Sequence, residues 1–259
     1  MAISASNLTT GNDVDGGSSS TTASVSPTSN NLVLLTITSR TGITANPNQP
    51  TATGLGLTWV AVNSVVYDTT SSSRKRITTL RALGTVTPGT ITIDFGGQNQ
   101  THVYWSVDQV SGIDTSGTNG SGAIVQSATN KDETPIAADG TLTVTLAAFG
   151  NTNNGTFGAF AADPGEGLIT VGSGFSVLGT VSTTTINLAT EWRGGNDTTV
   201  TAINDTTTLT AAIGGIAIEI KAAASSLIKA VNGLAIASVK TVNGLAIASV
   251  KSINGLTNV

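Results

Sequence analysis

The chain of 259 residues contains no cysteine and a single histidine, His102. The lack of cysteine excludes disulfides, thiolate metal sites and cysteine nucleophiles. One histidine also excludes a multi-histidine metal site within one chain. The sequence further lacks a G-x-S-x-G nucleophile turn and a lysine-containing glycine loop for phosphate, although it has 30 glycines. We therefore expect a protein that is not an enzyme and that holds no cofactor and no metal.

Charged side chains are also scarce, at 10% of the chain, and 15 acidic residues outnumber the 11 basic ones. This balance argues against a nucleic-acid-binding surface. The longest apolar stretch, residues 211–220, contains Glu219 and is too short to span a membrane. Residues 1–10 lack the basic and apolar regions of a secretory signal. We expect neither a nucleic acid nor a membrane as partner, and no signal peptide.

Hydroxyl side chains are abundant, with 45 Thr and 26 Ser in the sequence. Disorder usually requires low hydrophobicity together with high net charge, but here the mean hydropathy is +0.20 and the net charge is −4. Because Thr, Val and Ile are β-branched, the common residues favour strands over helices. The composition predicts an all-β fold.

Apolar and hydroxyl residues alternate along much of the chain, which is typical of antiparallel sheets packed face to face. We expect about ten strands in an antiparallel β-sandwich of jelly-roll type. The segment 57–67 is apolar on both faces, so we expect a strand covered on both sides. The alternating segments are 33–37, 91–95, 103–107, 142–146, 186–192 and 216–220.

A change of charge divides the chain near residue 222. Residues 1–222 hold 8 basic and 15 acidic side chains, a balance of −7, whereas residues 223–259 hold three lysines and no acid, a balance of +3. The pattern of the sequence changes at the same place. We therefore predict a β-sandwich domain over 1–222 and a separate tail over 223–259.

The tail is an internal repeat with a period of 11 residues, in which NGLAIASVK follows Val231 and Val242, and NGL follows Ile253. An 11-residue period also occurs in right-handed coiled coils. The apolar residues, however, scatter around a helical wheel, and each glycine would cost a helix about 1 kcal/mol. Asn-Gly is the strongest signal for a two-residue hairpin turn. We therefore predict strands joined by hairpins.

A turn at Asn243-Gly244 would pair Val242 with Leu245 and Lys240 with Ile247. An isolated hairpin is marginal in water, so the tail must dock onto the body, a sister chain or another protein. The tail residues that we expect to carry assembly are Asn232, Gly233, Leu234, Ile236, Asn243, Gly244, Leu245, Ile247, Asn254 and Gly255.

Three segments of the body, GLTWVAVNSVVYD, FGGQNQTHVYWSVDQVSGID and GTNGSGAIVQSATN, together with the NGLAIASVK repeat, carry a resemblance. The chain resembles uncharacterised β-sandwich proteins of tailed bacteriophages and environmental viruses. The resemblance implies a virion component of the decoration, head-fibre or tail-associated kind, with no catalytic residues. It implies a protein made in the host cytoplasm and placed on the virion surface, where it contacts the major capsid or another virion protein. A homo-oligomer, above all a trimer, would let several tails complete one sheet.

Two further functions fit the sequence. A carbohydrate-binding module for attachment to surface glycans would use exposed tyrosines, and Tyr67 and Tyr104 are the candidates for stacking on a sugar. An extracellular filament subunit would polymerise when the tail strand of one chain extends the sheet of the next.

Other polar clusters have a structural interpretation beside the functional one. His102, Tyr104 and Asp108 lie on one strand face, which we expect to be solvated. Trp105 and Trp192 follow the apolar phase, so we expect them in the core. Arg74 and Arg76, with Arg81 nearby, would either grip an acidic partner or protect an edge strand. The acidic pairs are expected in solvated loops; they are Asp13 with Asp15, Asp132 with Glu133, and Asp163 with Glu166.

Overall fold

The protein is all-β, as its composition predicts. The computed structural model describes residues 3–69, 72–136, 140–163, 169–204 and 211–224, and six two-residue strands beyond them. Within these ranges the one helical segment is a 3-10 turn, Ser121–Ala123. No helix among the described residues is long and apolar enough to cross a membrane. The chain divides into a compact unit over 2–222, called the body here, and a second unit that contains residues 223–259, called the tail.

The body consists of two halves of eight strands each. The first half contains β1 (Ser4–Asp13), β2 (Ser19–Thr21), β3 (Leu32–Arg40), β4 (Thr51–Gly54), β5 (Val60–Tyr67), β6 (Lys75–Ala82), β7 (Ile91–Asp94) and β8 (His102–Ser111). The second half contains β9 (Ile124–Ile136), β10 (Gly140–Thr145), β11 (Gly155–Asp163), β12 (Ile169–Val171), β13 (Ser176–Ser182), β14 (Asn187–Arg193), β15 (Thr199–Asn204) and β16 (Ala211–Ile220).

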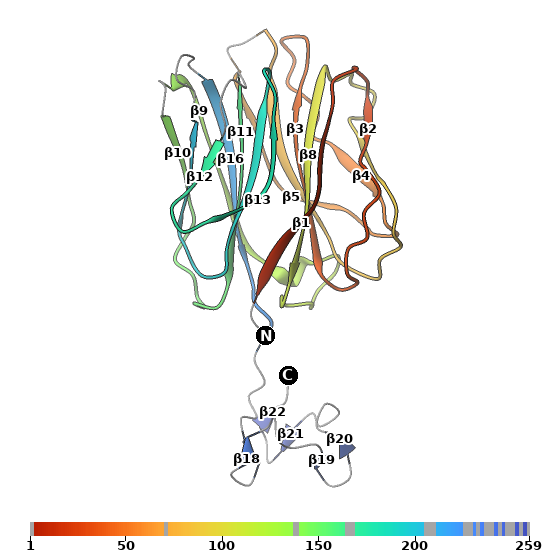
Figure 1. Cartoon of the computed structure of the whole chain (residues 1–259), viewed down its shortest axis with the longest axis vertical. Helices are drawn as coiled ribbons and strands as arrows, with labels where there is room; N and C mark the ends of the chain where they lie inside the picture. Colours follow the sequence, from red (N-terminus) through yellow and green to blue (C-terminus); the bar gives the residue numbers. More distant parts are fainter. Residues whose placement is uncertain are drawn as a thin grey trace. The chain divides into compact units, whose positions relative to one another are not determined.

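Both halves have the same strand order. In the first half a five-stranded sheet runs β1-β8-β3-β6-β5 and a three-stranded sheet runs β2-β7-β4. In the second half the orders are β9-β16-β11-β14-β13 and β10-β15-β12, so each strand number is raised by eight. The strands pair antiparallel throughout. The chain therefore repeats one eight-stranded unit, with the first copy in red to yellow and the second in green to blue (Figure 1).

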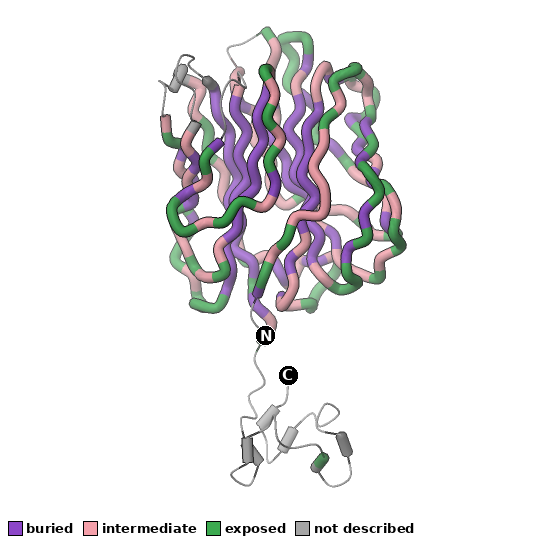
Figure 2. The backbone as a smooth tube through the Cα atoms, in the orientation of Figure 1, coloured by how far each residue is buried: buried purple, intermediate pink, exposed green. Residues whose placement is uncertain are grey.

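The two five-stranded sheets pack against each other at the centre of the body. One apolar cluster lies between the sheets of the first half and another between those of the second half. The third cluster joins the two five-stranded sheets, and the buried strands form the middle of the body (Figure 2). Residues of this central cluster include Leu34, Tyr67, Tyr104, Phe157, Leu188 and Ile216.

Contacts between the halves are reciprocal. Strand β1 contacts β13, and β9, its equivalent, contacts β5, the equivalent of β13. Strand β8 contacts β14 in the same way that β16 contacts β6. Ile113, after β8, also pairs with Ala222, after β16. Reciprocal contacts of this kind characterise the isologous interface of a two-fold dimer, which here lies within one chain.

This arrangement corrects three expectations. The estimate of about ten strands is wrong, because the described residues of the body already form sixteen. The strand expected over 57–67 begins at Val60 and is mostly half-buried rather than covered on both sides, because β5 is an edge strand. The polar face of β8 is not solvated, because the second half covers it and buries Tyr104 and Asp108. The core placement of Trp105 and Trp192 is confirmed.

Strand β3 shows why alternation underestimated burial. Leu35 and Ile37 belong to the core of the first half, as their phase predicts. Thr36 and Thr38 on the opposite face are also fully buried. Their hydroxyls find partners there, since Thr36 shares a hydrogen bond of 3.1 Å with Thr79. A hydroxyl face can therefore form part of an interior when its hydrogen bonds are satisfied.

The described residues of the tail form three short antiparallel strand pairs. In each pair, one strand precedes an Asn-Gly dipeptide in the sequence and the other follows it. They are β17 (Ala230–Val231) with β18 (Leu234–Ala235), β19 (Thr241–Val242) with β20 (Leu245–Ala246), and β21 (Ser252–Ile253) with β22 (Leu256–Thr257). Val242 pairs with Leu245, which is the pairing that a two-residue turn requires. The pairing of Lys240 with Ile247 falls on residues that the structure does not describe.

Candidate functional site

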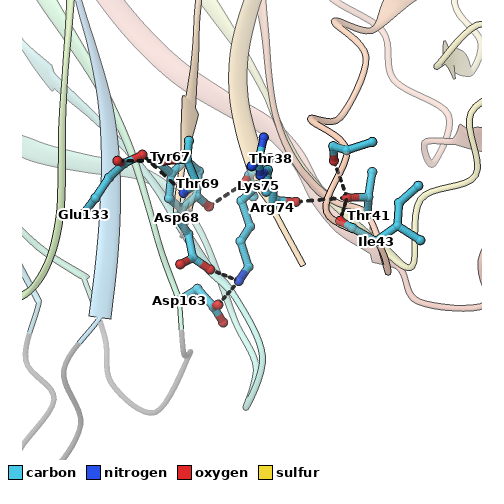
Figure 3. A network of polar contacts seen from close by, with 11 residues as sticks. Thr38, Thr41, Ile43, Tyr67, Asp68, Thr69, Arg74, Lys75, Glu133 and Asp163 are labelled. Atoms are coloured by element: carbon cyan, nitrogen blue, oxygen red, sulfur yellow. Dashed lines mark hydrogen bonds and ion pairs between the residues drawn. The ribbon is translucent and has the colours of Figure 1, made fainter. Parts of the chain in front are cut away.

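An ion cluster joins the two halves at the end of the body where β3, β5 and β11 finish. Lys75, the first residue of β6, is 1% exposed and pairs with both Asp68 and Asp163 (Figure 3). Asp68 follows β5 in the first half, whereas Asp163 is the last residue of β11 in the second half. Burial raises the pKa of Asp163, while its hydrogen bond to Lys75 opposes that rise. A buried ion pair adds little net stability but is costly to break.

Further hydrogen bonds surround this cluster. The Tyr67 hydroxyl and the Thr38 hydroxyl lie 2.9 Å apart beside Lys75 (Figure 3). Thr69 donates to the Glu133 carboxylate of β9, with an Oγ1–Oε2 distance of 2.7 Å, and so links the halves a second time. The side chains at this end of the body therefore hold the two halves together.

Tyr67 and Tyr104 are fully buried, so the expectation that they are exposed is wrong. Burial raises the pKa of both phenols. The Tyr104 hydroxyl lies 3.0 Å from that of Thr183 in the second half, as an interior phenol requires. Neither ring is available to stack on a sugar. The sequence could not show this, because the covering residues belong to the other half.

A second polar network crosses the central interface. Asp108 on β8 is 0% exposed and accepts hydrogen bonds from Asn7 Nδ2 at 2.8 Å and from Ser106 Oγ at 3.0 Å. The Ser106 hydroxyl lies 3.2 Å from that of Thr190 on β14. Burial raises the pKa of Asp108 to about 6, although these hydrogen bonds oppose the rise. Sequence alternation missed this network by assigning β8 a solvated face.

His102 does not join Asp108 in this network. The bonds of Asp108 go to Asn7, Ser106 and Thr190, while the His102 ring stacks on Tyr104 with centroids 6.3 Å apart. The residues of the expected polar face are thus divided between an interior network and the end of the sheet.

The remaining polar candidates bind to neighbouring backbone or side chains. The Asp15 amide donates to the Asp13 carboxylate at 3.1 Å, and Glu133 pairs with Lys131 as well as Thr69. Glu166 lies outside the described residues. Among the residues that the structure describes, no three His, Cys, Asp or Glu side chains gather as metal ligands.

The arginines of β6 do not protect an edge, because β6 lies between β3 and β5, so that interpretation is wrong. Arg76 donates to the Pro47 carbonyl at 2.7 Å and to Ser64, and Arg81 donates to the Asn119 carbonyl at 2.9 Å. Arg74 donates to Asn46 Oδ1 at 2.8 Å. These arginines fix loops of the first half.

An open cavity of about 390 Å³ lies at the opposite end of the body, beside the end of β16. Glu219 contributes to its wall but is fully buried, and its carboxylate accepts hydrogen bonds from Asn154 Nδ2 at 2.5 Å and Gln126 Nε2 at 2.6 Å. The Lys221 ammonium at its rim pairs with Asp114. The cavity is lined by Gly122, Ile124, Val125, Gly150, Asn151, Asn154, Glu219 and Lys221.

The structure describes only part of the tail set predicted for assembly. Leu234 and Leu245 each pair with a valine across an Asn-Gly dipeptide. The other residues of the set, including the Asn-Gly dipeptides themselves, lie outside the described residues. The comparisons with known proteins add no relative: no family model, no curated protein and no solved structure matches this chain.

Proposed function

We propose that this chain is a non-enzymatic structural protein of a virus particle, a capsid decoration or fibre-type surface protein that assembles through residues 223–259. The observation that carries the proposal is the division of the chain into a compact body and a repeat tail of different build and opposite charge. A compact body combined with a tail that binds other chains suits a protein that is attached through one unit and displays the other.

The body supports this proposal through its topology. In each half the first strand pairs with the eighth, the second with the seventh and the third with the sixth, and we interpret this as a jelly roll. The fifth strand departs from that scheme, because it pairs with the sixth in the larger sheet. Jelly rolls recur in viral capsid domains, which is support by analogy of fold and not by a site.

The use of polar side chains points the same way. Lys75, Asp108 and Glu219 are all fully or nearly fully buried and engaged with neighbours. They tie strands and halves together and do not converge on a reacting group. The carbohydrate-binding alternative has lost the exposed tyrosines on which it depended.

The tail supports self-assembly. Each repeat offers two pairs of residues in a hairpin, which is too little to be stable alone in water. Equivalent tails from several chains could complete one sheet, so a homo-oligomer, with a trimer favoured, is the expected state, bound to the major capsid or another virion protein.

Mass spectrometry of purified particles of the virus that encodes the chain tests this function. Peptides from both the body and the tail should be present in multiple copies per particle, at the virion surface after synthesis in the host cytoplasm. A non-structural viral protein from the same infected cells serves as the control for contamination. Abundance in infected cells with absence from particles would contradict the proposal.

A further inference from the structure

Three basic side chains form a row across the end of the first five-stranded sheet. Arg40, the last residue of β3, lies directly opposite Lys75 of β6 on one side and His102 of β8 on the other. Residues directly opposite each other in antiparallel strands point to the same face of the sheet. That face is directed toward the second half, because Lys75 pairs with Asp163.

The carboxylates near this row are used by Lys75. Asp68 and Asp163 both pair with its ammonium, whereas Arg40 has no ion pair among the described residues. Arg40 Nε and His102 Nδ1 are buried nitrogen atoms with no hydrogen-bond partner in the part of the chain that the structure describes. Buried polar nitrogens are normally satisfied. Arg40 Nε can only donate, and a neutral imidazole donates from Nδ1 in one of its two tautomers, so an absent hydrogen-bond acceptor would satisfy both atoms.

The surroundings hold the His102 side chain in place. The His102 ring is stacked on Tyr104 at an interplanar angle of 12°, and the Tyr104 hydroxyl is fixed by Thr183. Burial lowers the pKa of His102, with Arg40 and Lys75 adding to this effect and Asp163 opposing it. A negatively charged ligand would counteract these cations and so raise the pKa of His102.

We infer that Arg40 and His102 bind an oxyanion, a sulfate, phosphate or carboxylate group, at this end of the body. The guanidinium offers a planar fork of donors that matches such groups, and the imidazole adds one further donor. Lys75 contributes its field but not a contact, since Asp68 and Asp163 already bind it. This site is independent of the proposed assembly through the tail.

The single histidine makes the site measurable in the full-length protein. Its imidazole nitrogen signals are followed by nuclear magnetic resonance during titration with sodium sulfate, with sodium chloride at equal ionic strength as the control. Sulfate should shift the His102 signals saturably, with a half-saturation of about 1–10 mM. Sodium acetate, titrated in the same way, distinguishes a carboxylate site from one for tetrahedral anions.

Arg40→Gln should weaken sulfate binding at least about tenfold, because it removes hydrogen bonds to a charged group. Arg40→Lys keeps the charge but lacks the planar guanidinium, so its sulfate affinity should lie between those of wild type and Arg40→Gln. Arg76→Gln is the matched control, since Arg76 is a nearby arginine whose guanidinium is bonded to Pro47 and Ser64, and it should leave the affinity within about twofold. The Arg40 side chain makes no hydrogen bond to any described residue, so the variants should keep the wild-type amide spectrum elsewhere.

Equal shifts with sulfate and chloride, or equal sulfate affinity in wild type and Arg40→Gln, would overturn the inference. Loss of binding in Arg76→Gln to the same degree as in Arg40→Gln would also overturn it, because the effect would then be one of net charge alone.

Discussion

Asp108 shows how one residue couples the central interface to pH. Its carboxylate is fully buried against the second half and is held by the neutral donors Asn7, Ser106 and Thr190, with no cation among its bonds to described residues. Desolvation therefore outweighs hydrogen bonding and raises its pKa to about 6. At pH 8 the folded protein bears the cost of a buried charge.

We predict that Asp108→Asn stabilises the protein at pH 8 by about 1–2 kcal/mol and gives little gain at pH 5. The amide oxygen can still accept from Asn7, and its NH₂ can donate to Ser106. Urea unfolding at the two pH values measures the difference. A loss of stability at pH 8 would show that the carboxylate is favourable as a charge.

Gly214 marks a close approach between the halves. A Cβ at this position would lie 2.7 Å from the Tyr67 ring, which is itself held by Thr38. The Tyr67 ring of the first half thus depends on a missing side chain in the second.

Gly214→Ala should destabilise the protein by about 1–3 kcal/mol, because the buried ring has no room to move. Gly89→Ala is the control, since a Cβ there meets nothing within 4 Å, and it should stay within about 0.5 kcal/mol. Thermal unfolding of both variants checks the prediction, and equal losses would contradict it.

At the scale of elements, sequence patterns predicted strands well and their surroundings poorly. The alternation in β7 and β10 matches their burial, because these strands belong to the outer three-stranded sheets and have one face toward solvent. The alternation in β8 and β14 does not, because both faces of the central sheets are covered. Threonine and serine suit either environment, so their periodicity cannot distinguish water from a hydrogen-bonded interior.

The same limit explains why the sequence did not predict the ion cluster of the candidate site. Lys75 and Asp163 are 88 positions apart in sequence, and only the packing of two halves brings them together. The two halves were not apparent as a repeat, since equivalent strands share little sequence; β3 reads LVLLTITSR and β11 reads GTFGAFAAD. The tail repeat was visible because the same residue types recur every 11 residues along the sequence.

For the tail, the effect of Gly→Val substitutions on stability has opposite signs in a hairpin and in a helix, so it distinguishes the two structures. In a type I′ turn, Gly244→Val places a β-branched residue at positive φ and costs about 1–3 kcal/mol. In a helix the same change removes a helix-interior glycine and helps by up to about 1 kcal/mol. We expect Gly233→Val and Gly244→Val to weaken oligomerisation, and Gly244→Asn to be nearly neutral because Asn tolerates positive φ. Sedimentation at matched concentration compares the three, and tighter association of the Val variants would exclude the hairpins.

The whole molecule should be more stable in mild acid than in base. Burial raises the pKa of Asp108 to about 6 and that of Glu191 to about 7. Stability from a group with a raised folded pKa is complete below its unfolded pKa and is lost as pH rises through the folded value. Asp114 has the opposite sign, since Lys221 and Ser116 lower its pKa to about 2, so its contribution is lost as pH falls toward that value.

We therefore predict a stability maximum near pH 4.5–5, with a loss of about 2–4 kcal/mol between pH 5 and pH 8. Urea titrations across this range measure it, and Glu191→Gln should flatten the upper part of the profile. A flat or rising profile between pH 5 and pH 8 would contradict the burial of these charges.

The body is complete within one chain, whereas we expect the tail to require partners. The body already buries one two-fold interface internally, so it has no need of a second copy to cover its central sheets. The described residues of the tail form short strand pairs.

Light scattering on the full-length chain and on residues 1–222, at matched and rising concentration, tests this division most directly. We predict a homo-oligomer for the full-length chain, with the mass of a trimer, and a monomer for 1–222. Electron microscopy of the same samples should show discrete particles and no fibres. A full-length chain that stays monomeric at high concentration, or a truncated body that assembles as well as the full chain, would contradict the account.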